Sequence, residues 1–305
     1  MIEPTTLADA DWRGRAADHF QRARRFTGPA RERRARRIPH PTMDFLFEYY
    51  AFPFSLLEKW HPGLGVGLEW SPGADGPDLP PGFTSQWYRV ENGRVFADAA
   101  RLGEKQRARL EWIAGLLDAT RERPPNFGCY GLHEWAMVYK GISVRHGHTL
   151  ALRLPQSEID AVVESRPVCC SHHDAFRYFA PTARPLNLLQ PDAESRTLLE
   201  QPGCLHANMD LFKWAAKAMP WVGSDLLMDC FELAVDLRDL DMRASPYDLT
   251  GYGREPVRVE TAAGRRQYEA EQRALAARAA PLRNHLTTAI LATLAAARGG
   301  QRSMI

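Results

Sequence analysis

The stretch that decides the fold is "GCLHANMDLFKWAAK", residues 203–217. Its apolar residues recur at the spacing of one helical face, at Leu205, Met209, Phe212 and Ala216. Polar residues occupy the adjoining face, at His206, Asp210, Lys213 and Lys217. The pattern predicts a helix at the edge of the core, where these groups either form a reactive site or tie the core edge together.

Helical patterns of this kind cover most of the chain. The first predicted helix runs over residues 7–26 and ends at Thr27–Gly28–Pro29. Further helices are predicted over residues 43–60 with an interruption at Pro53, and over 102–123, 132–139, 157–165, 191–201, 204–219, 224–242 and 264–297. No alternation of strands with helices builds a parallel sheet, so the expected class is mainly α.

One β element stands out in "QWYRVENGRVFAD", residues 86–98. Asn92–Gly93 separates two β-rich runs, and both positions of a type I′ turn need positive φ. We therefore expect a single helical domain with a small β-hairpin near residues 86–98. Its parts are a basic N-terminal helix and arm over 1–40, a helical core over 41–297 and a tail over 298–305.

The composition is that of a globular protein. The chain has 305 residues, of which 45% are hydrophobic and 25% charged. It has five cysteines and no CxxC pair, and the adjacent Cys169 and Cys170 are a poor zinc signature. We interpret them as reduced thiols of a cytoplasmic protein. No apolar run is long enough to span a bilayer, so no membrane association is expected.

Charge is spread unevenly along the chain. The formal net charge is +2, yet residues 13–37 hold ten arginines against two acidic residues, Asp18 and Glu32. Such a run can contact the phosphates of duplex DNA without reading sequence. The alternative is a solvated surface helix.

Residues 127–141, "FGCYGLHEWAMVYKG", form a first candidate cluster. His133 and Glu134 are candidate catalytic residues, although Met137 stands where a zinc HExxH motif needs its second histidine. Trp135 and Tyr139 are candidate substrate-binding residues. The alternative is a structural helix with one histidine bonded to the main chain.

Residues 169–181, "CCSHHDAFRYFAP", form a second cluster. The candidate substrate-binding residues here are His173, Asp174, Phe176, Arg177 and Tyr178, and His172 is a candidate metal ligand. The local alternative for Asp174 is a helix cap.

The helix over 203–217 carries the third cluster. His206 and Asp210, one turn apart, can share a metal ion, or Asp210 can orient the His206 ring. Asp210 can also act as a base without a metal, with Lys213 lowering its pKa and contacting substrate. A plain intrahelical hydrogen bond is the alternative.

The fourth cluster is an acidic stripe within residues 224–249, made of Asp225, Asp229, Glu232, Asp236 and Asp239. Like charges at these spacings repel one another. We expect Asp225 and Asp229 to pair with the basic N-terminal stretch. Glu232 and Asp236, central in the helix, are candidate metal ligands.

Several of these motifs resemble one family. "HPTMDFLFEYY", "FGCYGLHEWAMVY", "DAFRYFAPTARPLN", "EQPGCLHANMDLFKWA" and "DLDMRASPYDL" look like a family widespread in actinobacteria and often labelled 3-methyladenine DNA glycosylase. The resemblance covers residues 7–286. It implies a DNA-repair hydrolase that cleaves the N-glycosidic bond of an alkylated purine. Stacking would fall to Trp135, Tyr139, Phe176 and Tyr178, and activation of water to Glu134 or Asp210.

Two other functions fit the same residues. The first is a metal-dependent enzyme of the non-haem iron or manganese type acting on a small molecule, with ligands among His172, His206, Asp210, Glu232 and Asp236. The second is a non-catalytic binding protein. Neither GxGxxG nor GxxxxGK[ST] occurs, so no nucleotide cofactor is expected. The enzyme hypotheses require the clusters to meet in one aromatic-walled cavity.

Overall fold

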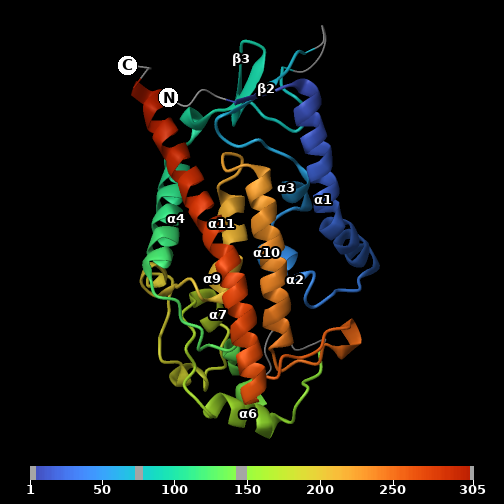
Figure 1. Cartoon of the computed structure of the whole chain (residues 1–305), viewed down its shortest axis with the longest axis vertical. Helices are drawn as coiled ribbons and strands as arrows, with labels where there is room; N and C mark the ends of the chain where they lie inside the picture. Colours follow the sequence, from blue (N-terminus) through green and yellow to red (C-terminus); the bar gives the residue numbers. More distant parts are fainter. Residues whose placement is uncertain (1–4, 73–77, 142–149, 303–305) are drawn as a thin grey trace.

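The computed structural model describes residues 5–72, 78–141 and 150–302. The protein is mainly α with one small sheet, as predicted (Figure 1). Its centre is α9 (Leu205–Lys217), in which every side chain but Lys213 and Lys217 is buried. Packed around α9 are α10 (Ser224–Arg243) and the long α11 (Ala262–Arg302), and α4 (Glu104–Glu122) lies against α11. A helix buried on nearly all sides forces its polar residues into the interior.

The N-terminal helix is longer than predicted. α1 spans Asp9–Arg36 and passes through Pro29, where the sequence predicted its end. Side-chain contacts hold the helix on both sides of the proline: Thr27 before it and Arg31 after it both bond to Glu58, and Arg33 pairs with Asp44. These contacts offset the backbone hydrogen bond that a helical proline removes.

Short helices lie between α1 and the central helices. α2 (Phe45–Tyr49) and α3 (Phe54–Glu58) are separated at Pro53, as predicted. The others are α5 (Leu132–Met137), α6 (Gln156–Glu164), α7 (His173–Phe176) and α8 (Arg196–Leu199). The helix predicted over 191–201 is thus only one turn long, because the Asp192 carboxylate accepts the backbone N–H groups of Glu194 and Ser195 in a turn before it.

The predicted hairpin is present and belongs to a larger sheet. β3 (Tyr88–Glu91) pairs antiparallel with β4 (Arg94–Ala97) around Asn92 and Gly93, which both have positive φ. Two strands that the sequence analysis did not predict, β1 (Thr5–Leu7) and β2 (Val66–Glu69), complete the order β1-β2-β4-β3. The sheet and the end of α11 lie at one end of the molecule and α6 lies at the other (Figure 1).

The structure differs from the prediction at the C-terminal end of the chain and in part of the acidic stripe. α11 continues to Arg302, so residues from 298 onward begin as helix, not as a tail.

Arg22 of α1 bonds to Asp229 and also to Glu232 of α10, which confirms the predicted pairing for Asp229. Asp225 is exposed and forms no ion pair within the part of the chain that the structure describes. None of the helices in that part is long and apolar enough to cross a membrane.

Candidate functional site

A cavity of about 750 Å³ opens between α2, α5, α7, α9 and α10. Aromatic side chains line much of it: Phe45, Tyr49, Tyr50, Phe52, Tyr178 and Tyr247. The ionisable side chains on the same walls are His40, Glu48, Glu134, Asp174, Arg177, His206, Lys213, Lys217 and Arg238. A concave, mostly apolar site with a few convergent polar groups is the usual form of a small-molecule pocket.

The aromatic wall is ordered by ring contacts. Phe45 and Tyr49 of α2 stack with their ring centroids 5.0 Å apart and their planes 12° from parallel. The Arg238 guanidinium lies 3.8 Å from the centroid of the Phe45 ring, which fixes that ring against α10. The α2 segment therefore presents a preformed flat surface to the cavity.

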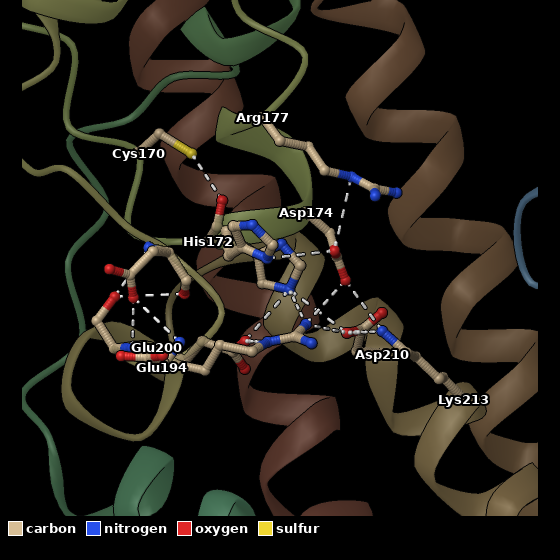
Figure 2. A network of polar contacts seen from close by, with 12 residues as sticks. Cys170, His172, Asp174, Arg177, Glu194, Glu200, Asp210 and Lys213 are labelled. Atoms are coloured by element: carbon tan, nitrogen blue, oxygen red, sulfur yellow. Dashed lines mark hydrogen bonds and ion pairs between the residues drawn. The ribbon is translucent and has the colours of Figure 1, made fainter.

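At the cavity wall and directly behind it, Asp174 and Asp210 form ion pairs with the same two cationic side chains (Figure 2). The Arg196 Nη2 atom lies 2.9 Å from Asp174 and 3.1 Å from Asp210, and Lys213 Nζ lies 3.0 Å and 3.2 Å from the same carboxylates. The Tyr50 hydroxyl donates to Asp210 at 2.8 Å. Burial opposes ionisation, but the nearby positive charges prevail and lower the pKa of both carboxyl groups. Both are therefore carboxylates at neutral pH.

Two further buried residues complete this lower network. Arg196 Nε donates to Glu200 at 2.7 Å. His172, which is fully buried, has its Nε2 atom 3.4 Å from Asp210 and 3.5 Å from Glu200. Glu200 and Asp210 thus hold Arg196 from two sides, so the guanidinium is fixed between the carboxylates.

A second network lies on α5 and α10. His133 Nε2 is 2.7 Å from Asp241, and Arg238 donates to Asp241 at 2.6 Å and to Glu134 at 2.9 Å. Gly131, with a φ of 70°, is the N-cap of α5, and a Cβ there would lie 3.3 Å from the Ala244 methyl group. The close approach of α5 to the end of α10 brings His133 and Glu134 within reach of Arg238 and Asp241.

His206 lies between the two networks and faces the cavity. Its ring centroid is 4.6 Å from that of His133 and 5.4 Å from that of His172. Burial and the charge of His133 lower the pKa of His206 to about 3. No hydrogen bond to its ring is found within the described ranges. His206 is therefore a neutral imidazole with a free lone pair at the cavity wall.

The hydrogen bond between His206 and Asp210, one of the alternatives that the sequence left open, is not formed. Asp210 turns instead to Tyr50, Arg196 and Lys213. The reason is electrostatic: a buried carboxylate is stabilised far more by two cations and a hydroxyl than by one neutral imidazole.

Two groups of three side chains could each offer three ligand atoms to a metal ion. Within each group the three atoms lie within 4.8 Å of one another. They are His133, His206 and Asp241, and His172, Asp174 and Asp210. These groups could hold a metal ion. In both, however, a guanidinium already bonds to the carboxylates: Arg238 in the first and Arg196 in the second.

The structure brings nine of the fifteen predicted site residues together on the cavity wall or directly behind it. Those on the cavity wall are Glu134, Asp174, Arg177, Tyr178, His206 and Lys213. Asp210 and His172 lie directly behind it, and His133 lies behind His206.

The other predicted residues lie elsewhere. Trp135 is fully buried with its Nε1 donating to the Ala244 carbonyl, and Tyr139 donates to Glu164. Phe176 packs on Phe179, and His173 lies outside the lining beside Asp174. Glu232 and Asp236 pair with Arg22 and Arg278 on the outer face of α10, so they are remote from both candidate metal groups.

Sequence reasoning missed the groups that balance the buried charge. Arg238 and Asp241 continue the apolar stripe of α10 at Ala234 and Leu237, and charged residues in such a stripe are a readable signal of a buried pair. Arg196 and Glu200 have the i, i+4 spacing of a helical ion pair, but their burial depends on contacts with α9.

Comparison with known proteins gives no match to a family model, to a curated protein or to a solved structure.

Proposed function

We propose that the protein hydrolyses the N-glycosidic bond of an alkylated purine nucleotide. The observation that carries this proposal is the combination, in one cavity, of a flat aromatic wall with the carboxylates of Glu134 and Asp174. An N-alkylated purine in a nucleotide is flat and positively charged. Aromatic faces stack on such a base and carboxylates stabilise its charge, as well as the cationic sugar that forms when the bond breaks.

His206 suits this chemistry because it is neutral. The wall already carries four cationic side chains, and a pKa near 3 keeps the His206 ring from adding a fifth charge that would repel a cationic base at neutral pH. Its lone pair can accept a proton from the water that attacks the sugar carbon. The bonding electrons leave with the base, which departs uncharged. Alkylation has already activated this leaving group, so a weak base is sufficient.

Ion pairs behind the cavity wall hold the two carboxylates in place. Arg196 and Lys213 hold Asp174 at the wall and leave it ionised. Arg238 holds Glu134 in place at the same wall. Because each carboxylate is fixed by a bonded cation, neither has to reorganise as positive charge develops on the substrate.

A neighbouring hollow suits the phosphate groups. It has a volume of about 270 Å³, shares Pro39 and Glu48 with the cavity, and is lined by Arg33, Arg34 and Arg37 from the end of α1. A nucleotide with its base in the cavity would have its phosphates near this basic surface. This arrangement extends the proposal to duplex DNA as the partner.

The assay is release of free base from duplex DNA that carries an alkylated purine, with unmodified duplex as the blank. The proposal predicts base release above the spontaneous rate, and a large loss in Glu134→Gln. Glu164→Gln is the matched control, because Glu164 is exposed and outside the cavity. Release at the spontaneous rate by the wild-type protein would refute the proposal.

A metal-dependent reaction is the second candidate, favoured by the two histidine–aspartate groups. For His172, Asp174 and Asp210 to hold an ion, Arg196 would have to leave the position where it contacts both carboxylates. The residues therefore fit a metal poorly as they stand. Metal analysis of tag-free protein decides between the candidates, since about one equivalent of iron or manganese per chain would favour the second.

A further inference from the structure

The cavity is larger than a methylated base requires. Pockets for drug-sized ligands have volumes of about 300–1,000 Å³, and the cavity, at about 750 Å³, lies in the upper half of that range. A methylated purine base is much smaller than such a ligand. A flipped nucleotide also brings its sugar toward the cavity, so the side chains on the wall, more than the volume, indicate what fills the remaining space.

Methionines flank the ion pair that crosses the cavity wall. Glu134 of α5 bonds to Arg238 of α10 at 2.9 Å, and both side chains line the cavity. Met137 follows Glu134 at i+3 and Met242 follows Arg238 at i+4, and both methionines line the cavity as well. Residues at these spacings are neighbours on one face of a helix. The charged pair therefore continues into apolar surface on both helices.

This apolar surface suits a ring or a branched chain. Met137 and Met242 are only 7% and 3% exposed, so surrounding residues hold them in place and the surface that they do expose faces the cavity. Leu150 and Tyr247 add further apolar surface to the same wall. A thioether side chain adapts to the shape of its neighbour and makes favourable contacts with aromatic rings.

The charge on the base decides which way its substituent points. In an N-alkylated purine the positive charge lies in the ring that carries the alkyl group. A base whose charge is bound by Glu134 therefore directs its substituent toward the side chains beside Glu134, which include Met137. Around the other wall carboxylate, Asp174, lie the cations Arg177 and Lys213, which offer an apolar substituent a less favourable surface.

We propose that the cavity selects purines that carry a bulky apolar group, such as benzyl, on the charged ring nitrogen. This inference rests on the proposed function, because the charge of the alkylated base sets its orientation. Phe45 and Tyr49 stack on the base, and Glu134 binds its charge. Met137 and Met242 contact the substituent. A methyl group in the same place buries less apolar surface and therefore binds more weakly.

The test compares 7-methylguanosine with 7-benzylguanosine by calorimetry on the full-length protein, at a mildly acidic pH where both nucleosides are cationic. The benzyl compound should bind about tenfold more tightly or better, because it buries an additional ring. Met242→Ala should bring the two affinities close together. Met228→Ala is the matched control and should keep the preference, because Met228 is buried on the same helix but outside the cavity.

Three results would overturn the inference. Equal affinities in the wild type, or tighter binding of the methyl compound, would do so and leave the proposed function standing. Equal loss of the preference in Met228→Ala and Met242→Ala would do the same. Absence of binding by both nucleosides is the third. If Met242→Ala does not fold, Met137→Ala is measured in its place.

Base release is not part of this readout. A protein that prefers the benzyl compound but releases no base from alkylated duplex would therefore contradict the proposed function and not the preference of the cavity.

Discussion

His133 Nε2 lies 2.7 Å from Asp241 Oδ1, and both side chains are almost completely excluded from solvent. Burial opposes a charge on the ring, but Asp241 outweighs it and raises the pKa of His133 well above its usual value. The resulting cation lies edge-on to His206, where burial and then this charge lower the pKa of the second ring to about 3. Burial therefore does most to keep the imidazole that faces the cavity neutral, and the charge on His133 adds to it.

This pair predicts a pH dependence of stability. A histidine whose pKa is raised by folding stabilises the protein fully below its unfolded pKa, about 6.5, and this contribution is lost as pH rises through the folded pKa. We expect the free energy of unfolding to fall as pH rises from about 7, and His133→Gln to remove that part of the slope. Urea unfolding at a series of pH values measures it. Equal slopes in the two proteins would contradict the assignment of charge to His133.

Arg196 is predicted to be essential for stability. Arg196→Met would leave Asp174, Asp210 and Glu200 with Lys213 and the half-exposed Arg177 for compensation. Breaking a buried ion pair costs about 3–5 kcal/mol. Chemical denaturation gives the change in unfolding free energy.

Arg278→Met is the control for Arg196→Met. It removes an ion pair with Asp236 in which both side chains are about half exposed, so stability should change by less than about 1 kcal/mol. Similar losses in the two variants would mean that the buried network has no special role.

Tyr49 is predicted to bind the base by stacking. Tyr49→Leu removes the flat face beside Phe45, and the loss of stacking is worth about 1–3 kcal/mol, or about a 5- to 150-fold weaker affinity. Binding of a methylated purine nucleoside is measured by calorimetry. Tyr139→Leu should leave affinity unchanged, since Tyr139 lies outside the cavity; the reverse order would place the ligand elsewhere.

The exposed arginines at the end of α1 should contribute to DNA affinity without sequence preference. Arg36 and Arg37 have no acidic partner within the described residues. Changing both to Gln should reduce the slope of log affinity against log salt by about 0.9 per lost phosphate contact. Arg13→Gln is the control, since Arg13 already pairs with Asp9. An unchanged slope in the double variant would remove this surface from the DNA interface.

The sequence predicted the helices and the hairpin more accurately than it predicted which side chains contact one another. The central helices and the hairpin follow from periodicity and from Asn92–Gly93, which are local properties. The end of α1 was predicted wrongly, because Thr27, Arg31 and Arg33 find partners beyond Pro29 that no local pattern reveals.

For the site residues too, local patterns in the sequence do not reveal the partners of each side chain. His206 and Asp210 are one turn apart, and a bond between them was one of the alternatives. Arg196 and Tyr50, which come from other segments, together with Lys213 decide the partners of Asp210 instead. Trp135 and Tyr139 have the residue types of a pocket wall but face the core and the surface of α6.

The most direct measurement of the central claim is single-turnover release of base from alkylated duplex DNA at neutral pH, for the wild type and His206→Gln. The account predicts that the wild type releases the base and that the variant, with unchanged unfolding free energy and DNA affinity, is about 10²- to 10⁴-fold slower. Equal rates in the two folded proteins would contradict it, as would wild-type release no faster than the spontaneous reaction.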